Sequence, residues 1–364
     1  MSQEPSKSYR PQDLHEAGSE NPLELAAQGF FWTGGELVDH PVAGKAMRGQ
    51  QYVEYWVPRK LTHDLPIVMI HGGGGQGTDF LGTPDGREGW VHWFVRQGWA
   101  VYVVDRPQHG RSPFNPEFQG EMGRPGPTIF LERLFTRPQD FEDNYPQARL
   151  HDKWPGTGTM DDPSFLSFLA GTGPTLADHA AAQTDAQRAG AELLDRIGPA
   201  IILSHSAGGP PGWLLADARP ELVKAIVAAE PLGPPFEAIS GPLPFGVTHA
   251  PLTYDPPLGE GETLASQDMP SPGDGLVAYK VQADPARRLP NLCDMPVVVV
   301  TAEASWMAAD NHAMVHFLRQ AGVTVDHMRL EEHGIHGNGH ALQLETNSDE
   351  VAALIHSWLE EKGF

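Results

Sequence analysis

Cysteine is nearly absent from this chain, which has a single one, Cys293, among 364 residues. One cysteine excludes a disulfide within the chain and any zinc site built from several cysteines. Long apolar runs are absent too: no apolar segment opens the chain and no run reaches about 18 residues. We therefore expect neither a signal peptide nor a membrane-spanning helix, and a cytoplasmic protein.

Positive charge is the second scarcity, with 25 Lys and Arg against 47 Asp and Glu and a formal net charge of −22. The mean field of that charge repels nucleic acids, anionic membrane surfaces and strongly anionic substrates. It therefore favours a small neutral molecule as partner, although it also serves solubility. The 40% of hydrophobic residues is enough to fill a sizeable core.

The chain divides into a polar N-terminal arm, residues 1–27, and one domain, residues 28–364. The domain opens with two aromatic and β-branched segments, 29–33 and 52–57, which are typical of an antiparallel pair. Short segments that are apolar throughout then recur, which is typical of parallel strands covered on both faces. These segments are 67–70, 100–104, 201–203, 225–228 and 297–300.

Helical periodicity lies between these segments, at 90–97 and at 178–197. Residues 341–345 also look helical, and a last helix begins near Asn347, with Glu350 completing a capping box. The pattern predicts an α/β fold with a mostly parallel, doubly wound sheet.

Two stretches rich in Pro, Gly and aromatic residues, about 113–177 and 233–292, interrupt this alternation. Each follows the C-terminal end of a predicted strand, where open α/β sheets bind ligands. We therefore interpret them as lid-like binding insertions, with ordinary surface loops as the alternative. Their apolar residues could also form the interface of a homodimer.

Ser206 follows an apolar strand at a predicted tight turn, in the segment Ser204-His205-Ser206-Ala207-Gly208. A helix with two early prolines comes next. Small residues two positions before and after a serine allow a sharp strand-to-helix turn that exposes the hydroxyl. The pattern predicts a nucleophilic serine, and a structural turn serine is the alternative.

A run of glycines, residues 72–75, follows the first of the apolar strands. Bare backbone lets N–H groups converge on an oxygen that becomes negative during a reaction. We predict an oxyanion hole formed by Gly73 or Gly74 together with Ala207. A phosphate-binding loop fits less well, because the run lacks the Lys-Ser/Thr of a P-loop.

A nucleophilic serine needs a base, and histidine is the side chain that titrates near neutral pH. Among the 17 histidines we prefer His340, at the end of a glycine-rich loop, over His333 and His336. A zinc site made of these three is a weaker alternative, because the glycines break any common helical face. We expect no metal and no cofactor.

The base needs an acid to fix its tautomer and to stabilise the imidazolium. Glu230 directly follows the strand at 225–228 and is our choice. Glu303 and Asp310, which follow the next strand, are the competing candidates.

With these residues in place, the chain resembles the α/β-hydrolase superfamily from about residue 28 to 364. The glycine loop at 71–77, the turn at 105–112, the serine turn at 204–208 and the late histidine loop recur in the family's order. More narrowly, the acid, the Gly-Asn-Gly-His segment and residues 247–254 look like a bacterial esterase subgroup of the esterase 713 type. That resemblance implies a glutamate as the acid, at Glu230. Some members have cysteines where this chain has Gly73 and Gly74, so no disulfide is carried over.

The resemblance implies a serine hydrolase, and the residues fit a Ser-His-Glu triad that forms an acyl-enzyme with a small-molecule ester or lactone. Amidase, lactonase and thioesterase chemistry use the same triad, and a ligand-binding protein without turnover is the alternative from another class. Aromatic residues in and near the insertions predict a pocket for a bulky or aromatic group. The predicted lining residues are Trp154, Phe236, Tyr254 and Trp306. They come from a larger set, of which we expect about half to lie in the core. Its other members are Phe130, Phe135, Phe141, Tyr145, Phe165, Phe168 and Phe245.

Overall fold

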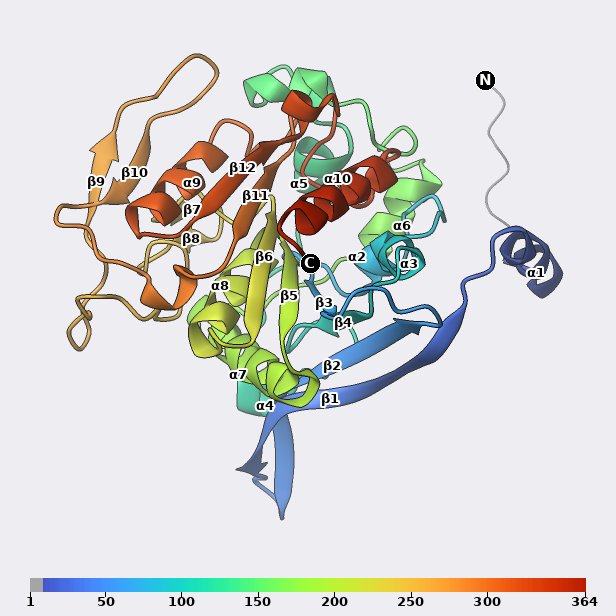
Figure 1. The fold of residues 1–364 in the computed structure, drawn as a ribbon, viewed down its shortest axis with the longest axis horizontal. Coiled ribbons are helices and arrows are strands. Elements are labelled where there is room, and N and C mark those ends of the chain that lie inside the picture. The colour runs from blue at the N-terminus through green and yellow to red at the C-terminus, as the bar shows by residue number, and fades with distance from the viewer. Residues whose placement is uncertain (1–8) are drawn as a thin grey trace.

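The computed structural model describes residues 9–364, and an eight-stranded sheet forms its centre (Figure 1). The strand order is β1-β2-β4-β3-β5-β6-β11-β12. The strands are β1 (Leu25–Asp39), β2 (Lys45–Pro58), β3 (Ile67–Ile70), β4 (Val101–Asp105), β5 (Ala200–His205), β6 (Val223–Ala229), β11 (Val297–Thr301) and β12 (Val325–Arg329). The pairs β1·β2 and β2·β4 are antiparallel and all other pairs are parallel, which confirms the predicted sheet.

Helices cover both faces of the sheet, because its central strands are apolar on both sides. One face packs on α7 (His179–Ile197), α8 (Gly209–Ala218) and α9 (Asn311–Gln320). The other face packs on α3 (Trp90–Arg96) and α10 (Ser348–Glu361). The predicted doubly wound arrangement is therefore confirmed. Within residues 9–364, no helix has both the length and the apolar character needed to cross a membrane.

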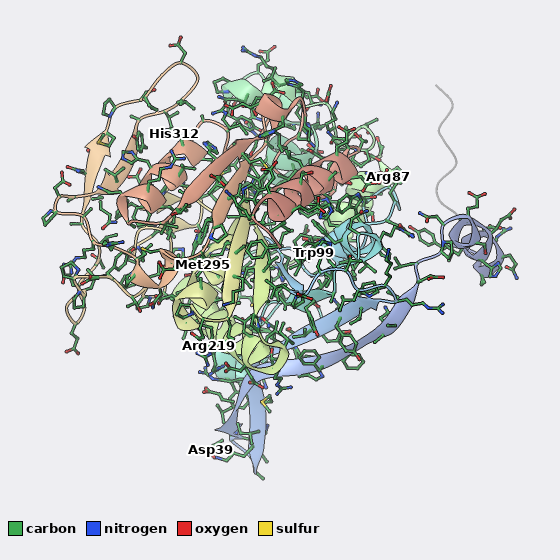
Figure 2. The ribbon with its side chains drawn as sticks, in the orientation of Figure 1. Asp39, Arg87, Trp99, Arg219, Met295 and His312 are labelled. Carbon is green, nitrogen blue, oxygen red and sulfur yellow. The ribbon has the colours of Figure 1, made fainter. Side chains whose placement is uncertain are left out.

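The β1–β2 hairpin is longer than the two predicted segments, and its tip projects away from the body of the molecule (Figures 1 and 2). Asp39 at the tip pairs with Lys45. The predicted arm overlaps the start of β1, and it contains the helix α1 (Pro11–Glu20), which buries no side chain. Residues 1–8 of that arm lie outside the described residues. A polar segment without an apolar period carries no sign of such a helix.

Both predicted insertions contain short regular elements rather than long structureless connections. The first follows β4 and contains α4 (Pro116–Gln119), α5 (Thr128–Leu131), η1 (Glu132–Thr136), η2 (Pro138–Asp140), η3 (Pro146–Leu150) and α6 (Pro163–Gly171). The second follows β6 and contains β7 (Glu237–Ala238), β8 (Gly241–Pro242), β9 (Ser266–Met269), β10 (Tyr279–Gln282) and η5 (Pro290–Leu292). The remaining short helices are α2 (Thr78–Leu81), η4 (Ser206–Gly208) and η6 (Leu330–His333).

Two local predictions near the C-terminus are wrong. The start of α10 has no capping box, because the Asn347 side chain makes no cap hydrogen bond. Its amide instead exchanges two hydrogen bonds with the amide of Asn338, with N···O distances of 2.6 and 2.9 Å. Residues 341–345 form turns and not a helix, and they are buried. This buried segment therefore lies against the loop that carries His340 and supports it.

Candidate active site

Ser206 lies at a sharp turn between β5 and α8, at the carboxyl end of β5. Its φ of +51° is in the left-handed region, which residues other than glycine seldom adopt. A Cβ on Gly208 would lie 2.5 Å from the carbonyl oxygen of Ile70, so only glycine fits there. Ser204 packs against Gly212 of α8, where a Cβ would lie 3.3 Å from the Ser204 hydroxyl. The strand, turn and helix predicted around Ser206 are therefore present.

His340 contacts both Ser206 and Glu230. The Ser206 hydroxyl donates a hydrogen bond to Nε2 of His340 at 2.8 Å. On the other side of the ring, Nδ1–H donates to Oε2 of Glu230 at 2.9 Å. The His340 side chain is 1% exposed and that of Glu230 is fully buried. The three residues that we singled out thus form one hydrogen-bonded chain.

Glu230 is held in a fixed orientation by the segment that follows β11. It comes directly after β6 and has a φ of +50°. Its Oε1 accepts a hydrogen bond from the backbone N–H of Ala302 at 2.7 Å, and its Oε2 accepts one from the Ser305 hydroxyl. The Ser305 oxygen in turn accepts from the backbone N–H of Met307. Ser305 therefore links the Glu230 carboxylate to the backbone of the segment after β11. The sequence did not reveal this contact.

The competing carboxylates have other partners. Glu303 accepts a hydrogen bond from the backbone N–H of Gly337 at 2.9 Å and lies 3.2 Å from Nδ1 of His336. Asp310 directly precedes α9 and makes no hydrogen bond to His340. The structure therefore brings Glu230, and not the competitors, to His340.

The three histidines of the late loop do not meet. The His336 side chain is 62% exposed and faces Glu303, whereas His340 is buried beside Ser206. His333 is the last residue of η6, at the start of this segment. In the described part of the chain, no group of three or more His, Cys, Asp or Glu side chains is placed to hold a metal ion.

Burial shifts the pKa values of His340 and Glu230. It lowers the pKa of His340 below its ordinary range, which favours the neutral imidazole that can accept a proton. It also raises the pKa of Glu230, while the hydrogen bonds from Ser305 and Ala302 act in the opposite direction. The ring N–H and these two donors all point at the carboxylate, which is an arrangement that suits its charged form.

The glycine loop lies directly against the serine turn. A Cβ on Gly72 would lie 3.1 Å from Cβ of Ser206, and a Cβ on Gly73 would lie 3.3 Å from Cβ of Ala207. The carbonyl of Gly74 accepts a hydrogen bond from the N–H of Gly173 in the first insertion, at 2.7 Å. Gly73 and Ala207 are thus neighbours, while Gly74 turns toward the insertion.

Glu345, which we did not predict as part of the site, anchors the loop that carries His340. It is fully buried and accepts hydrogen bonds from the Gly339 N–H and the Asn338 amide, both at 2.8 Å. His151 of the first insertion contacts the same carboxylate at 2.9 Å. Nothing in the sequence separates this glutamate from the surface acids near it, because its burial depends on the turns at 341–345.

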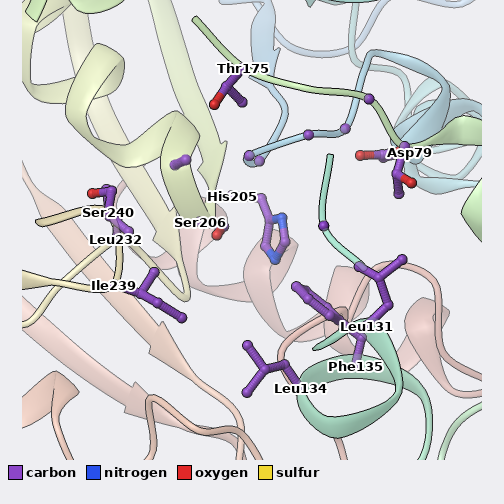
Figure 3. Close-up of a pocket in the computed structure, with 18 of the residues that line it drawn as sticks. Asp79, Leu131, Leu134, Phe135, Thr175, His205, Ser206, Leu232, Ile239 and Ser240 are labelled. Atoms are coloured by element: carbon purple, nitrogen blue, oxygen red, sulfur yellow. The ribbon is translucent and has the colours of Figure 1, made fainter. Parts of the chain in front are cut away.

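A cavity of about 510 Å³ opens at Ser206. Figure 3 shows Ser206 in the middle of it, with Asp79 to one side and Ile239 to the other. The first insertion supplies an apolar wall, and the second contributes fewer residues. The apolar residues of the wall are Phe130, Leu131, Leu134, Phe135 and Phe168.

Only one of the four predicted pocket aromatics lines this cavity, namely Trp306, whose ring lies 4.8 Å from that of His340. Trp154 is buried behind Phe168. Phe236, which belongs to the second insertion, is buried against Phe317 of α9. Tyr254 is buried in the same core, and its hydroxyl donates to the carbonyl of Phe245. The structure therefore does not place these three side chains among the residues that line this cavity.

The fold and the hydrogen-bonded site together define an α/β-hydrolase. The chain belongs to this family: residues 66–246 match the alpha/beta hydrolase fold family, and the chain is a hydrolase. It is 38% identical over 360 residues to a probable secreted lipase, phiG, of a fungal species (strain ATCC 74256). That match covers 98% of this chain and 94% of the lipase.

The fold is also similar to that of a solved structure described as a novel bacterial esterase. The TM-score is 0.61 at 22% identity, and the match covers 94% of this chain and 97% of the esterase. The predicted α/β-hydrolase fold is thereby confirmed.

Proposed function

We propose that the chain is a carboxylic-ester hydrolase that uses Ser206, His340 and Glu230 as a catalytic triad. The observation that carries this proposal is the continuous hydrogen-bonded chain of 2.8 and 2.9 Å that ends at a serine in the cavity. A serine that only shapes a turn has no need of a buried histidine and carboxylate behind it.

In the first half of the reaction, Ser206 Oγ attacks the ester carbonyl carbon while His340 Nε2 takes its proton. The tetrahedral intermediate collapses when the bond to the alcohol oxygen breaks, and the imidazolium returns the proton to that oxygen. Glu230 stabilises the imidazolium through the 2.9 Å hydrogen bond from Nδ1. The products of this half are a free alcohol and an acyl group on Ser206.

In the second half, a water molecule gives a proton to His340 and adds to the acyl carbon. The bond from that carbon to Ser206 Oγ then breaks, Oγ recovers the proton, and the carboxylic acid leaves. In both halves we assign the backbone N–H groups of Gly73 and Ala207 to the negative oxygen. Both residues line the cavity, and a Cβ on Gly73 would lie 3.3 Å from Cβ of Ala207; this proximity supports the assignment, which prefers Gly73 to Gly74.

The apolar wall of the first insertion supports a substrate with a hydrophobic portion. Phe135 and Trp306 flank His340, with ring centroids 5.5 and 4.8 Å from the imidazole. An aromatic or branched group packed there would hold the ester against Ser206 and exclude water from it.

Hydrolysis of a series of 4-nitrophenyl esters tests this proposal. The wild-type protein should release nitrophenolate, and Ser206→Ala should lose at least about 10³-fold in kcat. Ser357→Ala, on the exposed side of α10, is the matched control and should keep the wild-type rate. Equal rates for Ser206→Ala and wild type would remove the proposed nucleophile.

A further inference from the structure

We propose that the cavity contains a recognition site for a carboxylate group of the substrate, formed by Arg106 and Gln183. The inference rests on the proposed ester hydrolysis, because the carboxylate belongs to the same molecule whose ester Ser206 attacks. It concerns which esters are selected.

Arg106 places a guanidinium group at the cavity, and no carboxylate of residues 9–364 forms an ion pair with it. The residue is only 8% exposed, yet it lines the cavity. Its Nη2 donates to the carbonyl of Gly72 at 2.7 Å and lies 3.4 Å from Nε2 of His109. Within residues 9–364, no acid lies within 4.0 Å of the group, and its Nη1 has no hydrogen-bond partner. A buried cation without an anion is strongly unfavourable, so an anionic ligand would complete this site.

Gln183 supplies a second donor group. It is 7% exposed and also lines the cavity. Its Oε1 accepts from the backbone N–H groups of His249 and Ala250, at 2.8 and 3.0 Å, which fixes the amide. The amide NH₂ then has no acceptor among the described residues. Arg106 and Gln183 line the same cavity. Arg106 also lines a small void with Ala186, which lies one turn after Gln183 on α7.

Below pH 7 the other titratable groups leave this part of the cavity positive. Burial lowers the pKa of His109 to about 3 and lowers the pKa of His179, so both rings are neutral at pH 7. Asp79 is the only acid among the described lining residues, and burial raises its pKa to about 7. The charge of Arg106 lowers its pKa from the other direction, which places the two groups within electrostatic reach. The local field therefore differs in sign from the net charge of −22 on which the expectation of a neutral substrate rested.

The recognition site lies close to the reacting serine. Gly72, whose carbonyl accepts from Arg106, packs against Cβ of Ser206. A carboxylate bound to Arg106 and an ester carbonyl at Ser206 are therefore separated by only a few bonds. This spacing fits a monoester of a short dicarboxylic acid, or an acyl ester of a short hydroxy acid.

Matched ester pairs measure the selectivity. In the first series, the methyl monoesters of succinic, glutaric and adipic acid are compared with the methyl esters of the corresponding monocarboxylic acids and with the dimethyl esters. In the second series, 3-acetoxypropanoate is compared with propyl acetate. We expect the carboxylate-bearing ester to have at least tenfold higher kcat/KM in one series at pH 6, where Asp79 is mostly protonated. Equal kcat/KM values within the pairs of both series would overturn the carboxylate site. If the wild-type protein hydrolysed none of these esters and no 4-nitrophenyl ester, the proposed function itself would be overturned.

The selectivity ratio is kcat/KM for the carboxylate-bearing ester divided by kcat/KM for its uncharged counterpart. Arg106→Gln should bring this ratio close to one. If loss of the contact to Gly72 lowers the overall rate, it slows both members of a pair alike and by itself leaves the ratio unchanged. Arg124→Gln is the matched control: Arg124 lies at the exposed rim of the same cavity, and the ratio should stay within about threefold of wild type. A ratio that survives in Arg106→Gln, or that collapses only in Arg124→Gln, would refute the role of Arg106.

Calorimetry of ester binding to the Ser206→Ala variant tests the site without turnover and without changing Arg106. Monomethyl glutarate should bind at least tenfold more tightly than dimethyl glutarate. Equal affinities would overturn the carboxylate site and leave the proposed ester hydrolysis untouched.

Discussion

Replacing Glu230 by Gln isolates the contribution of the buried charge behind His340. The substitution keeps the size of the side chain but removes the negative charge 2.9 Å from Nδ1. When His340 takes the serine proton, it becomes a cation next to this group. Two unit charges about 4 Å apart interact by about 4 kcal/mol at an effective dielectric constant of 20. That energy corresponds to a loss of about 10³-fold in kcat.

The assay is steady-state hydrolysis of a 4-nitrophenyl ester by Glu230→Gln, Glu303→Gln and Asp310→Asn, each checked by circular dichroism for an intact fold. We expect the first variant to lose about 10³-fold in kcat with little change in KM. The other two should stay within about threefold of wild type, because neither carboxylate contacts His340. A Glu230→Gln rate within tenfold of wild type, or a collapse in either control, would refute the assignment of the acid.

Three further predictions concern the supports of the site. Gly208→Ala should lower the free energy of unfolding by about 2 kcal/mol or more, measured by urea denaturation, because the added Cβ would lie 2.5 Å from the carbonyl oxygen of Ile70; an unchanged midpoint would show that the turn does not need glycine. Glu345→Gln should lower both kcat and Tm, because its amide N–H groups would face the donors of Gly339 and Asn338. The control, Glu350→Gln on the exposed first turn of α10, should change neither. Equal behaviour of the two variants would contradict the anchoring role of Glu345. Asp79 has a raised pKa of about 7, so the folded state holds its proton more tightly than the unfolded chain and loses stability as pH rises from about 4 to 7. Asp79→Asn should therefore gain Tm over wild type at pH 8 and gain little at pH 4, and an equal difference at both values would count against this burial.

The sheet and the three residues of the hydrogen-bonded chain could be predicted because their signals are local. Segments such as 67–70 and 297–300 are apolar at every position, and the structure buries every one of those residues. Ser206 stands between small residues at a strand end, and Glu230 directly follows the next strand. Because parallel strands end at one edge of the sheet, residues that follow them come together there.

The lining of the pocket could not be predicted in full, because the sequence shows where aromatic residues occur but not which way their side chains point. Trp154 and Phe168 lie in the same insertion, yet the first is buried behind the second and only the second lines the cavity. The roles of Arg106 and Glu345 depend on contacts between distant segments, such as the one from His151 to Glu345. The cytoplasmic location and the homodimer stay predictions.

Covalent labelling with a fluorophosphonate tests the central claim most directly, because the reagent forms a stable adduct only with an activated serine. The labelled protein is digested and the modified peptide is identified by mass spectrometry. We predict one adduct on Ser206 that blocks ester hydrolysis in proportion to its occupancy, and no adduct in Ser206→Ala. An unlabelled Ser206 would favour a ligand-binding protein without turnover, and an adduct on another serine that abolishes activity would contradict the assigned nucleophile.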